Sequence, residues 1–149
     1  MSSISGLLQN KKPLVTARID RMVSAAVAQM TGADVGAVIV LDELGRIAGI
    51  FTERDCLQKV TRPGRDPGNT PLREVMTTSV RYAKPEQTIE ECLRLMTERF
   101  FRHLPVLDAQ GNILGIISIG DLVKARLSEQ EFVIDQMEHY ISDSLPVAR

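Results

Sequence analysis

The sequence predicts an α/β (α+β) fold made of two similar units that pack on each other, followed by a C-terminal helix. The first observation is that residues 49–55 (GIFTERD) recur as residues 115–121 (GIISIGD), 66 positions further along the chain. At the same offset and without a gap, residues 40–42 fall on residues 106–108, and both read VLD. A match in register over this length indicates a tandem repeat. Each unit of about 50 residues is too small to bury its apolar faces alone, so the two units are expected to pack together.

The first unit begins with an extended segment and a helix. An N-terminal arm at residues 1–13 precedes the extended segment at residues 14–17. Four apolar residues spaced i, i+3, i+4 and i+7 predict the helix, and Gly32 is expected to end it. These four residues are Val23, Ala26, Val27 and Met30.

A β-hairpin and a second helix complete the first unit. Two apolar runs, at residues 37–41 and 46–51, flank a turn at residues 42–45 that ends in glycine. The second helix is expected at residues 56–60. Residues 61–71 contain three prolines and two glycines, so they are expected to form an irregular connection between the units.

The second unit repeats this order of elements, and its sequence patterns for helix and strand are clearer. Residues 88–91 (TIEE) have the T-x-x-E form of a capping box at the start of a helix. Runs at residues 104–107 and 112–117 around a turn at 108–111 repeat the hairpin, and residues 118–127 repeat the second helix. The apolar face of the first helix of this unit consists of Ile89, Cys92, Leu93 and Met96.

Residues 128–131 (SEQE) offer a further capping box, which predicts a separate C-terminal helix. This helix has no counterpart in the first unit, and two roles for it are open: a strap across the protein's own core, or a dimer-forming helix. The apolar residues on roughly one side of it are Phe132, Val133, Met137, Tyr140 and Ile141.

Composition excludes several classes of function. The formal net charge of −1 gives no basic excess for nucleic acid or an anionic membrane surface. No apolar run approaches the roughly 18–20 residues of a membrane span, and residues 1–10 lack the pattern of a signal peptide, so we expect a soluble, cytoplasmic protein.

Cys56 and Cys92 lie in no metal-binding pattern and are expected to be packed thiols. A redox role for Cys56 at a helix N-terminus is the alternative, although the adjacent Asp55 carboxylate opposes it.

The recurring motif ends in TERD at residues 52–55 and in SIGD at residues 118–121. One interpretation is purely structural, because a hydroxyl followed three residues later by a carboxylate is close to a capping box. That interpretation does not account for the glycine three residues before the hydroxyl. The functional interpretation is that a helix N-terminus with free backbone N–H groups and a cap hydroxyl holds an anion, while the aspartate accepts hydrogen bonds from the vicinal hydroxyls of a sugar. A nucleotide offers both groups.

The doubled G-h-h-[ST]-x-x-D motif, in which h is an apolar residue, resembles that of a pair of cystathionine β-synthase (CBS) domains, called a Bateman module. VIVLD at residues 38–42 and LPVLD at residues 104–108 carry the same resemblance, which extends over about residues 14–127. The chain is similar to small stand-alone proteins with two CBS domains. The resemblance implies CBS repeats at residues 14–66 and 72–127, packed sheet to sheet with pseudo-two-fold symmetry, and a C-terminal helix and tail at residues 128–149. It also implies two clefts between the repeats and a homodimeric disc.

The resemblance further implies adenosyl ligands: AMP, ADP, ATP, NAD(H) or S-adenosylmethionine. Carried over by position, it makes Asp55 and Asp121 the ribose ligands, and Thr52 and Ser118 the hydroxyls on the phosphate side. Arg102 and His103 resemble basic residues that reach the phosphate. The adenine would lie against the start of each unit, at Thr16, Ala17, Tyr82 and Ala83.

The two sites are not equivalent in sequence. Arg102 and His103 align with Gly36 and Ala37, and Gly120 aligns with Arg54, so the cationic groups, Arg54 among them, are distributed unevenly. Because charge-assisted contacts to phosphate are stronger than neutral ones, we expect one tight site and one weaker or differently selective site.

No catalytic constellation is present in the sequence: it has no P-loop, no metal-ligand cluster and only two histidines. We therefore expect a regulatory module, not an enzyme, in which an adenine nucleotide biases a homodimer and signals to a partner protein in trans. The competing hypothesis is a structural dimerisation scaffold without a physiological ligand.

Overall fold

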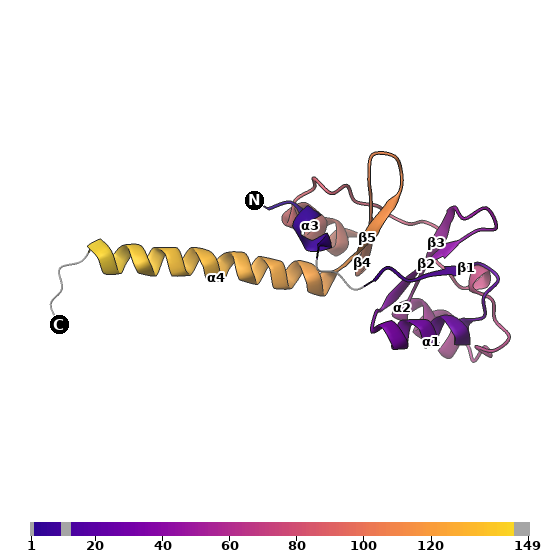
Figure 1. The fold of residues 1–149 in the computed structure, drawn as a ribbon. Helices are drawn as coiled ribbons and strands as arrows, with labels where there is room; N and C mark the ends of the chain where they lie inside the picture. Colours follow the sequence, from indigo (N-terminus) through magenta and orange to yellow (C-terminus); the bar gives the residue numbers. More distant parts are fainter. Residues whose placement is uncertain (1, 10–12, 145–149) are drawn as a thin grey trace.

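The computed structural model describes residues 2–9 and 13–144, and it shows a mixed α+β body from which one long helix projects (Figure 1). The first unit contains a three-stranded sheet, one longer helix and two short helical segments. Its elements are β1 (Thr16–Arg18), α1 (Val23–Ala33), β2 (Ala37–Leu41), β3 (Ile47–Thr52), α2 (Glu53–Asp55) and a π-helical segment (Cys56–Thr61).

The second unit contains a two-stranded sheet. Its elements are α3 (Ile89–Arg99), β4 (His103–Leu107), β5 (Ile113–Ser118) and the start of α4 (Ile119–Ser144). Two 3₁₀ turns lie outside these elements, one at Ile4–Leu8 and one at Leu72–Glu74. The second belongs to the connection between the units, which in the structure comprises residues 62–88, from the end of the π-helical segment to the start of α3. No helix in the described part of the chain combines the length and the apolar character that crossing a membrane requires.

The register of the strands repeats between the units. β1 is parallel to β2, with Ala17 opposite Val40, and β2 is antiparallel to β3. In the second unit β4 is antiparallel to β5, and Ala83 makes a single parallel bridge to Val106. Both of these alanine pairings occupy equivalent positions, and each hairpin has its register shift directly after its valine, Val40 or Val106. The predicted α+β repeat is therefore confirmed at the level of individual pairs.

Each hairpin turn is built on an aspartate. Asp42 Oδ1 accepts hydrogen bonds from the backbone N–H groups of Leu44 and Arg46, both at 2.9 Å. Asp108 Oδ1 accepts from Gln110 and Asn112 at 2.9 and 2.8 Å. These backbone hydrogen bonds favour the charged carboxylate and so lower the pKa of both aspartates.

Each unit has its own apolar core, and a third cluster joins the two sheets. Phe51 and Val38 are fully buried in the first core, and Leu104 and Ile117 are fully buried in the second. Between the sheets, Ile39 of β2 and Ile50 of β3 belong to a cluster against which Ile113 and Ile116 of β5 pack. The predicted packing of sheet on sheet rests on this third cluster.

Each 3₁₀ turn precedes one unit in the sequence but packs into the core of the other unit. Leu72, in the connection between units, is fully buried in the first core, and its N–H donates to the carbonyl of Arg21 at 2.9 Å. Ile4 is fully buried in the second core, and its N–H donates to the carbonyl of Gln87 at 2.8 Å. Residues 21 and 87 are equivalent in the repeat. The start of the chain is therefore not the simple arm that the sequence suggested, because residues 2–8 pack into the second unit.

Two helix boundaries differ from prediction. Gly32 lies inside α1, which ends at Ala33, and Asp34 in the left-handed conformation (φ 54°) caps its C-terminus. At the other end of the chain, Ser128 does not begin a new helix. Its hydroxyl donates to the carbonyl of Lys124 at 3.0 Å, so α4 runs without a break from Ile119 to Ser144.

Only the first turns of α4 pack on the body. Ala125 contacts the second core, and Arg126 forms an ion pair with Glu90 of α3 at 3.6 Å. From residue 130 to residue 139 every side chain is exposed, and the helix extends away from both units (Figure 1). α4 is therefore not a strap across the protein's own core. Of the apolar residues predicted to line one side of the helix, Tyr140 and Ile141 have side chains outside the described ones.

Candidate functional site: a cleft between the two units

A cavity of about 990 Å³ lies where the motif of the first unit faces the second unit. The first unit contributes the end of β3, α2 and the π-helical segment, and the connection between units contributes Thr77. The second unit contributes the segment that joins α3 to β4 and the end of β5. Among the lining residues are Thr52, Arg54, Asp55, Lys59, Arg102, His103 and Ser118.

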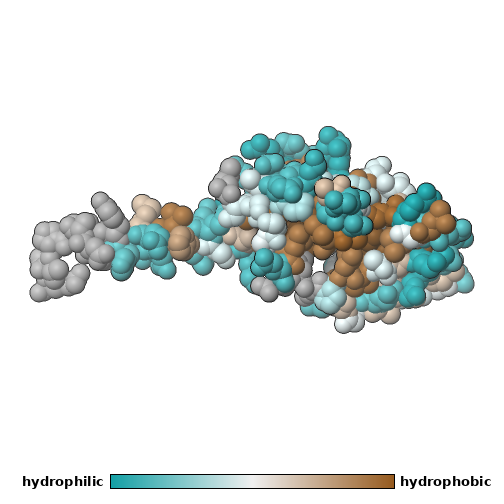
Figure 2. Space-filling model, turned by 45° about the horizontal axis from the view of Figure 1, so that its top comes forward, coloured by the Kyte–Doolittle hydropathy of each residue, from teal (hydrophilic) through white to brown (hydrophobic). Residues whose placement is uncertain are grey.

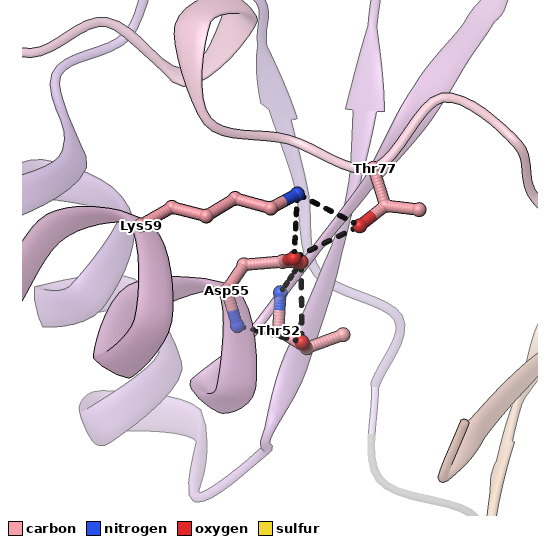
Figure 3. A network of polar contacts seen from close by, with 4 residues as sticks. All are labelled: Thr52, Asp55, Lys59 and Thr77. Atoms are coloured by element: carbon pink, nitrogen blue, oxygen red, sulfur yellow. Dashed lines mark hydrogen bonds and ion pairs between the residues drawn. The ribbon is translucent and has the colours of Figure 1, made fainter. Parts of the chain in front are cut away.

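Asp55 is at the centre of a polar network in this cavity (Figure 3). Only 7% of its surface is exposed, and it is one of two buried polar residues of the described chain. Its Oδ2 accepts hydrogen bonds from the N–H and the hydroxyl of Thr52, at 2.9 and 3.1 Å. Its Oδ1 accepts from the hydroxyl of Thr77 at 2.8 Å and lies 3.1 Å from Lys59 Nζ. Lys59 Nζ also donates to the Thr77 hydroxyl at 3.3 Å.

The structural interpretation of the motif is correct as far as it goes. Thr52 caps α2: its hydroxyl accepts from the N–H of Asp55 at 3.2 Å, and Asp55 returns a hydrogen bond to the N–H of Thr52. The N–H of Glu53 donates to the carbonyl of Gly36 at 3.0 Å. Three backbone donors at this helix start are therefore bonded within the chain. These three N–H groups are not free to hold an anion as expected, so a phosphate here would depend mainly on side chains.

The glycine of the motif has a structural cause that sequence reasoning missed. The N–H and the carbonyl of Thr77 pair with Ile50, at 2.8 and 2.9 Å, and this brings the connection between units across Gly49. A Cβ at position 49 would lie well inside 3.0 Å of the Thr77 carbonyl oxygen. At Gly115, the equivalent residue, a Cβ would meet Leu8 Cδ2 at 3.2 Å. Close approach of a second segment therefore requires glycine at position 49.

The basic side chains of the cavity come from both units. Arg54 reaches across to the second unit, where Nη1 donates to the carbonyl of Phe100 at 2.9 Å. Phe100 ends α3 in the left-handed conformation (φ 58°). Arg102 and His103 line the same cavity from the start of β4. The terminal atoms of His103 and Glu53 both lie beside Gly36, where a Cβ would be 3.1 Å from His103 Nε2. The sequence left open which motif aspartate these cations accompany, and the structure places them with Asp55.

The second motif adjoins a different cavity, of about 420 Å³, between the N-terminal segment and α4. Asp121 lies there, and its Oδ2 accepts from the N–H of Ser118 at 2.8 Å. The N–H of Asp121 donates to the Ser118 hydroxyl at 3.1 Å, which repeats the capping of the first unit. Position 125, equivalent to Lys59, is alanine. The structure therefore separates the two motif aspartates into two chemically different cavities.

The four residues predicted to contact adenine do not line the large cavity. Ala17 and Ala83 are buried in the first and second cores, where they pair with β2 and β4. Thr16 is half-buried and Tyr82 is 39% exposed. Their proposed contact with adenine stays a prediction.

Two residues of the Asp55 network were not found from the sequence. Lys59 follows Asp55 by four positions, so it lies on the same side of the helix, and this spacing could have identified it. Thr77 could not have been found in this way, because its contact with Asp55 depends on how the connection between units folds back on β3.

Comparison with known proteins gives one family. The family model described as "CBS domain" matches residues 6–62 and residues 72–128. A solved structure of a protein with CBS domains from Burkholderia ambifaria is 41% identical and superimposes with a TM-score of 0.81, over 87% of this chain and 96% of that chain.

Two further solved structures share the fold at lower identity and contain ligands. CBSX2 in complex with AMP has a TM-score of 0.69 and 23% identity, over 87% of this chain and 99% of that chain. The CBS domain pair of MJ0100, in complex with 5′-methylthioadenosine and S-adenosyl-L-methionine, has a TM-score of 0.75 and 19% identity, over 87% and 98% of the two chains.

Proposed function

Because this chain belongs to the CBS-domain family and carries two CBS domains in tandem, we propose that it is a non-catalytic regulatory module that binds an adenosine nucleotide between its repeats. In this proposal Asp55 accepts hydrogen bonds from the ribose hydroxyls, and Thr52 lies on the phosphate side. Arg54, Arg102 and His103 neutralise the phosphate. Asp121 forms a second, weaker site, and Ser118, which caps the helix of Asp121 but lines the large cavity, lies on the phosphate side.

The observation that carries the proposal is the composition of the large cavity. It combines a buried carboxylate with cations from both units, which is what a sugar joined to a phosphate requires. A carboxylate alone would repel phosphate, and cations alone would not recognise a ribose. Because the cations come from the second unit as well as the first, bound phosphate would hold the two units together.

The proposed ligands are AMP, ADP, ATP or NAD(H), with S-adenosylmethionine as the alternative. CBS pairs of the same fold bind AMP in one protein, and 5′-methylthioadenosine and S-adenosyl-L-methionine in another. At 23% and 19% identity, these two proteins support only the assignment of the fold. The choice of phosphorylated ligands for this chain rests on Arg54, Arg102 and His103.

Thermal unfolding in the presence of each ligand tests the proposal. A ligand at about 100 times its dissociation constant adds about 2.7 kcal/mol to the free energy of unfolding, which a melting curve resolves. We expect AMP, ADP, ATP, NAD or NADH to raise the melting temperature selectively. A shift with S-adenosylmethionine alone would favour the alternative ligand. If neither these nucleotides nor S-adenosylmethionine raises the melting temperature of protein freed of bound ligand by unfolding and refolding, the scaffold without a ligand becomes the better account.

We further propose that the output passes through a homodimer and a partner protein in trans. The support is the projecting part of α4, where Phe132, Val133, Ile134 and Met137 are each more than half exposed. Figure 2 shows hydrophobic residues on this part of the helix, apart from the larger hydrophobic band of the body. Exposed apolar side chains on one element favour contact with another protein. Sedimentation of a chain truncated after Leu127 tests this, because an unchanged oligomer would show that α4 is not the contact.

A further inference from the structure

The carboxylate of Asp55 makes four polar contacts with other residues of the chain. A carboxylate has about four lone-pair positions for hydrogen bonds. Oδ2 accepts from the N–H and hydroxyl of Thr52, and Oδ1 accepts from Thr77 and from Lys59. A ribose that hydrogen-bonds to Asp55 through two hydroxyls must therefore displace at least one of these partners.

Of these partners, Lys59 is the one that can leave. Thr52 is the residue that caps α2, and its N–H is fixed by the backbone. Thr77 is held in place by two backbone hydrogen bonds to Ile50. The Lys59 side chain is 42% exposed, and its ammonium is at the end of four rotatable bonds. Figure 3 shows the lysine reaching Asp55 and Thr77 from one turn further along the helical segment.

Where the displaced ammonium goes depends on the ligand. The lining of the cavity also contains Arg54, Arg102 and His103. The other carboxylate among the lining residues, that of Glu53, lies beside Gly36 together with His103. A ligand without a phosphate therefore leaves Lys59 without its carboxylate in a mostly basic cavity. A ligand with a phosphate supplies a new anion within reach of the same side chain. The exchange of one anion for another then costs little, because a charge-assisted contact is replaced by another.

We propose that Lys59 is an internal occupant of the ribose site, which the ligand must displace, and that it makes the cleft selective for 5′-phosphorylated adenosine over unphosphorylated adenosyl compounds. This inference rests on the proposed function, in which Asp55 binds the ribose. In the second motif the position equivalent to Lys59 is Ala125.

The test compares AMP with adenosine on wild-type protein and on the Lys59→Met variant by isothermal titration calorimetry. The variant keeps the length of the side chain and removes its charge. Lys84→Met is the matched control, because Lys84 is exposed and outside the cavity. ¹H–¹⁵N spectra, followed at Thr52, Asp55 and Thr77, assign the binding event to this cavity.

In Lys59→Met we expect adenosine to bind about two- to fivefold more tightly, because an ion pair with a part-exposed lysine no longer has to be broken. AMP is expected to bind about tenfold more weakly, because the phosphate loses a charged partner. Lys84→Met should leave both affinities at the wild-type values. The opposite signs for the two ligands are the signature of the exchange.

Equal effects on both ligands, or no effect on either, would overturn the role of Lys59 while leaving the proposed function intact. An equal loss would mean that Lys59 merely supports the structure around Asp55. Failure of wild-type protein to bind either ligand at this cavity would overturn the proposed function itself, and the inference with it. The two failures are therefore distinguishable in one set of titrations.

Discussion

Replacing Gly49 by alanine should disrupt the junction between β3 and the connection between the units. The new Cβ would lie well inside 3.0 Å of the Thr77 carbonyl oxygen, and this atom belongs to the backbone. The connection cannot move aside freely, because Thr77 pairs with Ile50 through hydrogen bonds of 2.8 and 2.9 Å. The strain must therefore be relieved by shifting both segments.

The expected cost follows from these contacts. Overpacking by a methyl group costs about 1–3 kcal/mol, and weakening two backbone hydrogen bonds adds about 1–2 kcal/mol. Alanine recovers about 0.4–1 kcal/mol by restricting the unfolded chain. The middle of these ranges is a fall of about 3 kcal/mol in the free energy of unfolding for Gly49→Ala. At about 2–4 °C per kcal/mol for a chain of this length, that is a fall in melting temperature of about 6–12 °C.

Gly115→Ala is the internal control, since it makes the same change at the equivalent position. Its Cβ would meet only Leu8 Cδ2, at 3.2 Å, and the end of a leucine side chain can rotate away. We expect a change within about 1 kcal/mol of zero. Urea unfolding followed by circular dichroism measures both variants. A Gly49→Ala protein as stable as wild type, or a Gly115→Ala protein equally destabilised, would refute the reasoning.

Three further predictions concern the rest of the chain. First, Ile4→Ala and Leu72→Ala should each lower the free energy of unfolding by about 2–4 kcal/mol, because each side chain is fully buried in a core. Thermal melts check this, and an Ile4→Ala melt like that of wild type would contradict the packing of the N-terminal segment. Second, hydrogen bonding lowers the pKa of Asp42 in the folded state, so its stabilising contribution is complete above the ordinary value of 3.8 and is lost as the pH falls through the folded-state value. Urea midpoints of wild type and Asp42→Asn should therefore converge in acid, and a constant difference down to pH 2 would count against this. Third, burial raises the pKa of the Cys92 thiol, whereas Cys56 is half-buried, so a thiol reagent at pH 8 should label Cys56 in the native protein and Cys92 only in denaturant; native labelling of both residues would be inconsistent with the packing.

The local parts of the fold could be predicted from the sequence because they depend on short-range patterns. The apolar run at residues 37–41 coincides with β2, and the T-x-x-E pattern places the start of α3 after Thr88, whose hydroxyl accepts from the N–H of Glu91 at 3.1 Å. The internal offset of 66 residues even anticipates the equivalence of Ala17 and Ala83. Each of these features is set by residues close together in the chain, or by exact repetition.

The errors come from tertiary contacts that no local pattern reports. Gly32 was expected to stop α1, but a helix continues through glycine where the next residue can cap it, as Asp34 does. Ser128 was expected to start a helix, but its hydroxyl bonds back to Lys124 within a helix that is already formed. The sequence predicts only an arm at Ile4, because the residue that its N–H contacts, Gln87, lies more than 80 positions further along the chain.

In the candidate site, too, local patterns identify single residues, whereas tertiary structure decides which of them lie together. Thr52 and Asp55 could be found from the repeated motif, and the resemblance added Arg102 and His103. Sequence alone could not group these residues in one cavity, because the two pairs lie about 50 positions apart and a cleft between repeats is lined by both. The motif also has fewer free backbone N–H groups than the sequence predicts. The capping box of Thr52 and Asp55 uses two of them, and the N–H of Glu53 donates to the carbonyl of Gly36.

Titration of AMP into wild-type protein and into Asp55→Asn, followed by ¹H–¹⁵N spectra, tests the central claim most directly. Asparagine keeps the size of the side chain, and its Oδ1 can still accept from the N–H of Thr52, so the capping of α2 should be retained, while the second acceptor oxygen and the charge that would hold the ribose hydroxyls are removed. The account predicts that AMP shifts the signals of Thr77, Arg102 and His103 in wild type, and that Asp55→Asn weakens this binding at least about tenfold. Unchanged affinity in Asp55→Asn, or shifts confined to residues away from this cavity, would contradict it.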